Sequence, residues 1–195
     1  AFDDYPVVGI NWKQATAFSN WRTKMMNSFL RKINQPILPE FRLPSESEWE
    51  YASRGGLDFS PYPWGGPYTR NIKGCFLANF KPLRGNYTAD GGIKAIKTAS
   101  YNPNGYGLYD MAGNVAEWTS NAYDESAFSY SHDMNADYHY NANEGDHAVL
   151  KRKAIRGGSW KDIAYFIQTG TRTFEYQDTA KCYIGFRCAV DFLGR

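Results

Sequence analysis

Side-chain oxygens beside glycine turns are the feature of this sequence best suited to binding chemistry. Asn79-Phe80 and Asp90-Gly91-Gly92 place an amide or a carboxylate next to exposed backbone carbonyls, and the run from Asp110 to Glu117 has carboxylates at both ends. Calcium takes about six to eight oxygen ligands, carbonyls included, in flexible geometry. Asp and Asn beside Gly are also common turn residues. The pattern alone therefore leaves a calcium site and ordinary turns open.

Other reactive residues carry weaker signals. His132, His139 and His147 lie in a polar stretch without zinc-type spacing, so we interpret them as solvated loop histidines. Gly157-Gly158-Ser159 lacks the pattern of a nucleophile elbow, and no histidine is near it in the sequence. It is predicted to be a structural turn.

The three cysteines, Cys75, Cys182 and Cys188, are too few for a disulfide framework. One disulfide with a free thiol would fit an exported protein, and three thiols would fit a cytosolic one. Cys182 and Cys188 could form a reactive pair, but neighbours along a strand point to opposite faces, so Arg187 is badly placed to activate Cys188. Structural thiols are the favoured interpretation.

Composition narrows the class of protein. The chain has 195 residues, which suits one domain, and a net charge of +2 gives no field that would attract nucleic acid. No run of about 18 apolar residues is present to span a membrane. The sequence opens at Ala1 without an initiator Met, which leaves an upstream signal or lipid anchor open.

Two helices must position the loops. Asn11 with Gln14, and Ser45 with Glu48, form capping boxes that predict helices over about 12–32 and from 46 to Gly55-Gly56. The first helix has one apolar face, formed by Phe18, Trp21, Met25 and Phe29. In the second helix, Trp49 and Ala52 are predicted to face inward.

After Leu57 the sequence predicts short strands separated by long loops. The expected strands are 155–156, 166–168 and 183–187, because these runs are rich in aromatic and β-branched residues. Loops this long are uncommon unless something fixes them. Residues 122–147, rich in Tyr, Asn, Asp and His, are predicted to be a surface insertion.

Six strings in order resemble the formylglycine-generating-enzyme, or sulfatase-modifying-factor, family: PVVGINWKQATAFSNW, RLPSESEWEYASRGG, YPWG, NPNGYGLYDMAGNVAEWTSN, RGGSW and GFRCA. The resemblance implies an α+β fold related to C-type lectins, with two main helices, short antiparallel strands and long loops. Residues 1–195 would form a single such domain that lacks the family's N-terminal strands.

The resemblance also implies two structural calcium ions. Their ligands would be Asn79, Phe80, Asp90 and Gly92 at the first site, and Asp110, Gly113, Val115 and Glu117 at the second. The phenylalanine, glycine and valine residues would contribute backbone carbonyls.

Catalysis is not implied. Active members bind copper(I) through two cysteines after the Gly-Gly-Ser turn, where this chain has Asp162 and Ile167. Neither can hold copper(I) as a thiolate does, so no copper and no enzymatic activity are expected. Cys188 matches a cysteine that forms a structural disulfide in the family. The position of its usual disulfide partner is occupied by Ser53 in this chain.

Within the family, residues 156–187 resemble gliding-motility lipoproteins of the GldK/PorK type, and GldJ next, from the type IX secretion machinery of Bacteroidetes. This implies a periplasmic, outer-membrane-associated scaffold held by an upstream lipid anchor. Its partners would be other copies in a ring and an N-type partner protein, and it would bind no nucleic acid. Residues 122–147 are the candidate contact surface, or else a surface loop without a partner. A lectin-like ligand-binding module is the second hypothesis and a formylglycine-generating oxidase the third.

Overall fold

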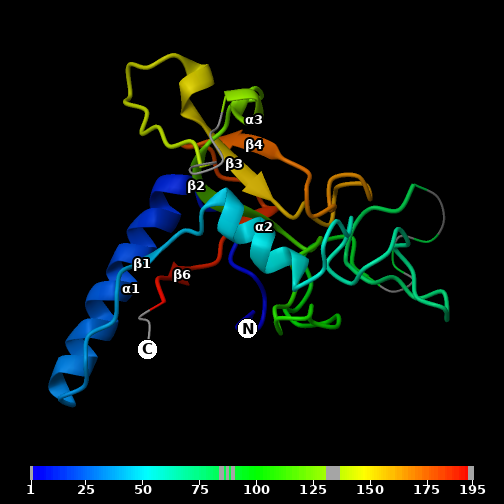
Figure 1. Cartoon of the computed structure of the whole chain (residues 1–195), viewed down its shortest axis with the longest axis horizontal. Coiled ribbons are helices and arrows are strands. Elements are labelled where there is room, and N and C mark those ends of the chain that lie inside the picture. Colours follow the sequence, from blue (N-terminus) through cyan, green and yellow to red (C-terminus); the bar gives the residue numbers. More distant parts are fainter. Residues whose placement is uncertain (1, 84–85, 87, 89–90, 131–136, 193–195) are drawn as a thin grey trace.

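The computed structural model describes residues 2–83, 86, 88, 91–130 and 137–192. Helix α1 (Trp12–Lys32) lies along one side of the molecule, and the turquoise and green loops lie at the opposite end, with the larger sheet between them (Figure 1). Within the described residues no helix is both long and apolar enough to cross a membrane. The predicted α+β arrangement of two main helices, short strands and long loops is confirmed.

The strands form two small sheets. The larger has the order β4-β3-β2-β5 and the smaller pairs β1 with β6. Their bounds are β1 (Phe41–Arg42), β2 (Ala116–Ala122), β3 (Arg152–Arg156), β4 (Thr173–Tyr176), β5 (Ile184–Gly185) and β6 (Ala189–Val190). Antiparallel pairing is confirmed for β1–β6, β2–β3 and β3–β4. The prediction of antiparallel pairing is wrong for β2 and β5, which are parallel. Residues 123–183 between them are long enough for the crossover connection that a parallel pair requires.

Both predicted capping boxes are present. Asn11 accepts a hydrogen bond from the Gln14 backbone N–H at 2.9 Å, and the Gln14 side chain accepts from the Asn11 N–H at 3.0 Å. Ser45 and Glu48 cap α2 (Glu46–Arg54) in the same way. Gly55 ends α2 with φ 59°, a left-handed conformation that glycine adopts at little cost. Two short helices follow, α3 (Ala127–Tyr130) and the 3₁₀ helix η1 (Ala148–Lys151).

The apolar face of α1 is not turned toward the core. Its four aromatic and methionine side chains remain exposed: Phe18 42%, Trp21 55%, Met25 54% and Phe29 56%. The helix instead buries the small residues Ala15 and Ser19. Small side chains let α1 approach the rest of the protein closely. The periodicity of the sequence therefore identified an apolar face of α1, but that face is not the one that packs against the core.

The predicted strand at residues 166–168 is wrong. Successive turns replace it, with the Asp162 N–H bonded to the Ser159 carbonyl at 2.9 Å and the Phe166 N–H to the Ile163 carbonyl at 2.9 Å. These turns bury Ile167 completely in one of two core clusters, beside Tyr62, Phe76, Ala78, Phe80 and Ala112. The other cluster surrounds Trp118 and Ile184.

The described part of the 122–147 segment is tied to the sheet by backbone carbonyls. The Tyr138 carbonyl accepts from the Ala122 N–H at 2.9 Å, and the Ala142 carbonyl accepts from the Gln177 side chain at 3.0 Å. Lys153 is fully buried and donates to the Tyr140 carbonyl at 2.7 Å, with its ammonium 3.9 Å from the centre of the Trp12 ring. His132 lies outside the described residues, and His139 and His147 are exposed, as predicted.

Lys153 should make stability rise with alkaline pH. Burial lowers the pKa of Lys153 from 10.5 to about 8, so between these values the unfolded chain holds a proton that the folded chain has released. The free energy of unfolding should therefore increase across this window, by up to about 3 kcal/mol. Urea unfolding of wild type and Lys153→Met at several pH values measures it. Parallel pH curves for the two proteins would refute the prediction.

Candidate functional site

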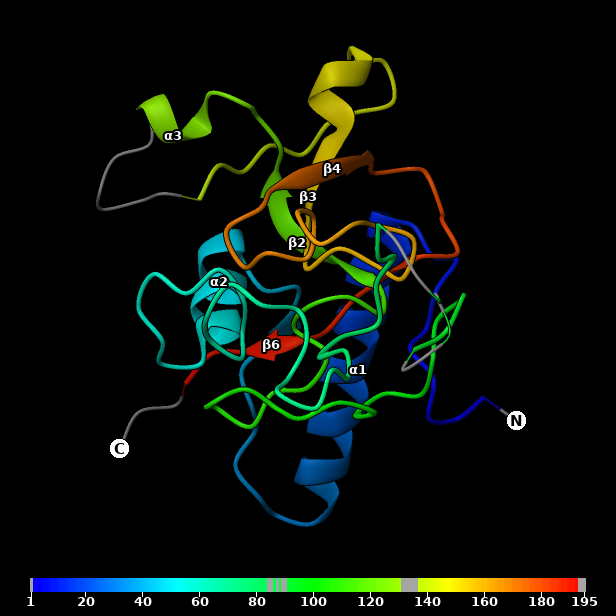
Figure 2. The same ribbon diagram turned by 90° about the vertical axis from the view of Figure 1, so that its right-hand side faces the viewer.

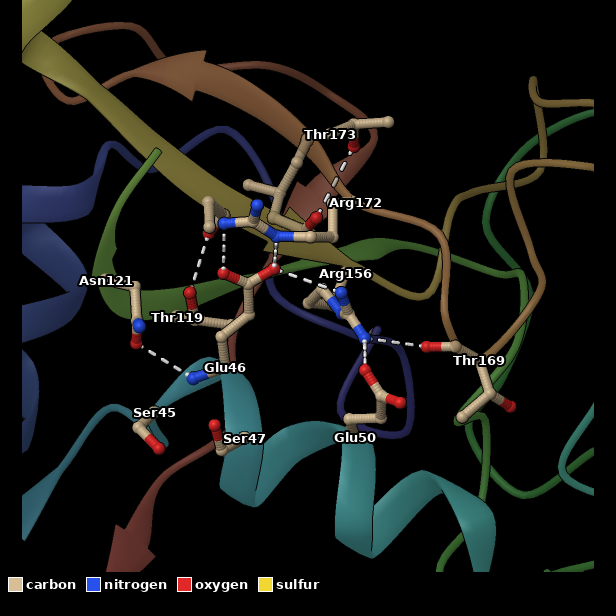
Figure 3. Close-up of polar contacts among 12 residues, drawn as sticks. Ser45, Glu46, Ser47, Glu50, Thr119, Asn121, Arg156, Thr169, Arg172 and Thr173 are labelled. Atoms are coloured by element: carbon tan, nitrogen blue, oxygen red, sulfur yellow. Dashed lines mark hydrogen bonds and ion pairs between the residues drawn. The ribbon is translucent and has the colours of Figure 1, made fainter. Parts of the chain in front are cut away.

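A buried ion network holds both ends of the segment that follows β3. Arg156 is 1% exposed and binds Glu46 at 3.0 Å and Glu50 at 2.5 Å, both on α2 (Figure 3). It also donates to the Thr169 carbonyl at 2.8 Å. Arg172 adds a second guanidinium to Glu46 at 2.6 Å. Because Arg156 precedes the Gly157-Gly158 turn and Thr169 follows Ile167, the network fixes where residues 157–169 lie.

Asp162 and Ile167, the positions that the resemblance assigns to copper-binding thiols, are both occupied by other interactions. One Asp162 oxygen accepts from the Ser159 N–H at 3.0 Å and from its hydroxyl at 2.6 Å, while the other pairs with Lys161 at 2.6 Å. Ile167 is 0% exposed in an apolar cluster. Asp162 is a carboxylate whose oxygens are already hydrogen-bonded, and Ile167 is an aliphatic core residue. Neither provides the soft sulfur ligand that copper(I) prefers.

No disulfide links the three cysteines: Cys75 and Cys182 are exposed and Cys188 is half-buried. The prediction that Ser53 occupies the position of the disulfide partner of Cys188 is wrong. Cys188 Sγ lies 3.5 Å from the hydroxyl of Ser19 on α1, whereas the hydroxyl of Ser53 donates to Thr169 at 3.4 Å. The chain next to β6 packs against α1 rather than α2, which a sequence alone does not reveal.

Three of the four residues predicted for the second calcium site lie together in space, and Gly113 is not among the residues that line their cavity. Asp110, Val115 and Glu117 line one open cavity of about 330 Å³. Burial raises the pKa of Asp110 and the nearby charge of Glu117 raises it further, while the hydrogen bond from the Ala99 N–H and the positive charge of Arg187 lower it. The Glu117 carboxylate already accepts from Arg187 at 2.6 Å and from the Trp49 indole at 2.8 Å. The other Glu117 oxygen accepts from Arg187 at 2.7 Å, so a calcium ion here would have to share both oxygens with the guanidinium.

The first predicted calcium site is described only in part, because Asp90 lies outside the described residues. Asn79 and Gly92 meet: the Asn79 side-chain oxygen accepts from the Gly92 N–H at 3.0 Å, and its amide donates to the Lys94 carbonyl at 2.9 Å. Phe80 packs its ring in the core cluster of Ile167.

Asn114 joins the two predicted calcium loops and was missed by the sequence analysis. Its backbone N–H donates to the Asn79 carbonyl at 2.7 Å, and its side chain exchanges hydrogen bonds with the backbone of Ile96 at 3.0 and 3.2 Å. Its φ of 63° is the left-handed conformation that Asn tolerates better than most residues. An Asn directly after Gly113 was the available signal.

In the part of the chain that the structure describes, no group of three or more His, Cys, Asp or Glu side chains is arranged to hold a metal ion. Calcium at Asp110 and Glu117 would therefore depend on backbone carbonyls, such as those of Gly113 and Val115, for its remaining ligands.

An apolar surface groove lies beside the Gly157-Gly158 turn. It has a volume of about 360 Å³ and is lined by Phe80, Lys81, Gly92, Ile93, Trp160 and Lys161. The Trp160 indole N–H is buried and has no hydrogen-bond partner among the described residues. A buried donor without an acceptor is costly.

Comparisons with known proteins identify the family of the chain. A family model for the "Sulfatase-modifying factor enzyme 1-like domain" matches residues 1–192. The chain is 32% identical to the "Inactive C-alpha-formylglycine-generating enzyme 2" of Bos taurus, over 95% of this chain and 50% of that protein. It is also 32% identical to the "Formylglycine-generating enzyme" of Streptomyces coelicolor, over 96% of this chain and 53% of that protein.

The fold is shared with PvdO from Pseudomonas aeruginosa, with a TM-score of 0.73 and 22% identity over 97% of this chain and 63% of that one. This chain spans about half the length of the curated relatives described above. Those relatives include both active and inactive proteins, so membership of the family does not by itself imply catalysis. The chain belongs to the sulfatase-modifying-factor, or formylglycine-generating-enzyme, family.

Proposed function

We propose that this chain is a non-catalytic member of its family that acts by binding and assembly. The observation that carries the proposal is the environment of Asp162 and Ile167. Asp162 is held in the turn by Ser159, and the side chain of Ile167 is fully buried in the core. A relative that is itself called inactive supports the possibility that the scaffold persists without the reaction.

The test is oxidation of a cysteine peptide of the sulfatase type in the presence of copper(I) and oxygen. We expect no formylglycine and no stoichiometric copper binding by the purified protein. The variants Cys182→Ser and Cys188→Ser are the matched controls. Turnover by wild type that disappears in either variant would overturn the proposal.

We further propose that the domain serves as a scaffold of a secretion or motility machine of the type IX class, periplasmic and associated with the outer membrane. The resemblance of residues 156–187 to the GldK/PorK type supports this placement. Sedimentation of the full-length protein, alone and with the N-type partner, should reveal a ring-sized assembly. A strictly monomeric protein that does not bind the N-type partner would contradict this finer proposal and leave the non-catalytic assignment intact.

A ligand-binding module is the second candidate function. The groove beside Trp160 favours it, because the Trp160 ring would suit the apolar face of a sugar and the flanking Lys81 would suit an anionic oxygen. Screening of a glycan array, followed by titration of wild type and Lys81→Gln, tests it. Gln removes the charge and keeps a polar side chain of similar length. An array without hits would count against this candidate.

Calcium is proposed as a structural ion at Asp110 and Glu117. A ligand that binds only the folded state stabilises it, by about 2.7 kcal/mol at a hundredfold excess over the dissociation constant. We therefore expect a chelator to lower the melting temperature of the wild type. In Asp110→Asn the oxygen bonded to the Ala99 N–H is kept while a charge is lost, so the chelator effect should shrink. Asp58→Asn, at an exposed position, is the control. If chelator did not change the melting temperature of the wild type, calcium binding would be refuted.

A further inference from the structure

The end of α1 and its return segment form an arm, residues 21–40, that projects from the body. Figures 1 and 2 both show this part reaching beyond the rest of the molecule. The arm is well held: Asn27 exchanges two hydrogen bonds with the backbone of Leu38, at 3.0 and 2.9 Å, and Thr23 accepts from the Phe41 N–H at 2.8 Å. Its shape is therefore fixed by local hydrogen bonds.

An apolar stripe runs along the arm. Trp21, Met25, Phe29 and Ile33 follow one another at four-residue spacing, and all are about half exposed, at 55%, 54%, 56% and 48%. Residues four apart lie one above the other on a helix, so these side chains form a continuous surface. Ile37 of the return segment is 52% exposed. An exposed patch of this extent on a protein surface usually marks an interaction site.

The charge on the arm is mainly positive, and its one acidic residue, Glu40, lies at the end of the return segment. Helix α1 contains five basic residues and no acidic residue. Lys13, near its start, pairs with Asp178 at 2.6 Å. On the arm, Lys24, Arg31 and Lys32 are exposed and make no ion pair within the described part of the chain. Lys24 and Arg31 are seven residues apart and therefore lie on the same side of the helix.

We propose that the arm docks on an anionic lipid surface, with the aromatic stripe at the level of the headgroups and the basic side chains on lipid phosphates. A helix that combines Trp and Phe on one face with Lys and Arg beside it binds in the plane of a membrane interface. Each basic side chain near an anionic leaflet adds about fivefold to the affinity. This contact would be additional to any lipid anchor and does not depend on the proposed assembly role.

A second copy of this chain is a poorer occupant of the stripe. Pairing two such arms through their apolar faces would bring the unpaired lysines and arginines of both chains together, and like charges oppose association. An anionic lipid surface supplies negative charge opposite Lys24, Arg31 and Lys32.

The experiment is co-sedimentation of the full-length protein, free of acyl chains, with vesicles of phosphatidylcholine containing about 30% phosphatidylglycerol. We expect binding to these vesicles, little binding to phosphatidylcholine alone, and loss of binding at about 1 M salt. The variant Lys24→Gln/Arg31→Gln/Lys32→Gln should bind roughly 100-fold more weakly. Met25→Ser/Phe29→Ser should also lose binding, with an unchanged circular dichroism spectrum because both side chains are exposed.

Matched controls place the same changes at the other end of the molecule. Phe59→Ser/Ile72→Ser removes two side chains that are 97% and 104% exposed, and Lys73→Gln/Lys94→Gln/Lys97→Gln removes three exposed charges. Both should bind like the wild type. Absence of binding to anionic vesicles would overturn the proposal, as would arm variants that bind normally. Arm variants that change only the sedimentation of the protein alone would show that the stripe is a contact between protein chains instead.

Discussion

Replacing Arg156 with Met should destabilise the protein by about 3–5 kcal/mol, the loss expected when one partner is removed from a buried ion network. Arg156 binds Glu46, Glu50 and the Thr169 carbonyl while it is 1% exposed. Its removal leaves the Thr169 carbonyl without this donor and weakens the neutralisation of both carboxylates. Urea unfolding followed by tryptophan fluorescence gives the free energy of unfolding.

The matched control is Arg42→Met. Arg42 also binds two carboxylates, Glu48 at 2.6 Å and Asp191 at 2.5 Å, but its side chain is 37% exposed. Exposed pairs contribute about 1 kcal/mol or less, because water and salt screen them. Equal losses in the two variants would mean that the Arg156 network is not the clamp that holds residues 157–169.

Replacing Gly113 with Ala should also cost several kcal/mol. Gly113 has φ 75°, and an added Cβ would lie 2.4 Å from the backbone oxygen of Asn79. The left-handed conformation costs about 1–2 kcal/mol for an L-residue, and the overlap with a rigid backbone adds about 1–3 kcal/mol. The melting temperature should fall by roughly 6–12 °C.

Gly107 separates the two causes of that loss. It has φ 77°, close to that of Gly113, but an added Cβ would meet nothing within 4 Å. Gly107→Ala should therefore show only the conformational cost of about 1–2 kcal/mol. If Gly113→Ala were no worse than Gly107→Ala, the close approach of the 113–114 loop to Asn79 would be wrong.

The loops around Asn79 and at residues 110–117 show how much of the candidate site can be predicted from the sequence. Asp110 and Glu117 are near in the sequence, and the structure places both on one cavity. Asn114 was not predicted, because its role depends on Asn79 and Ile96, which a loop brings to it from elsewhere in the chain. Local turn chemistry names candidate ligands, whereas contacts between loops require the fold.

The sequence by itself determined the features that depend on neighbours along the chain. The capping boxes of Asn11 and Ser45, the end of α2 at Gly55, and the absence of cysteine at 162 and 167 are all readable there, because each needs only a few consecutive residues. The tertiary structure alone decided which side of α1 packs, that Ser19 rather than Ser53 meets Cys188, and that Ile167 is in the core rather than in a strand. Those outcomes depend on which distant surfaces meet, and periodicity carries no information about that choice.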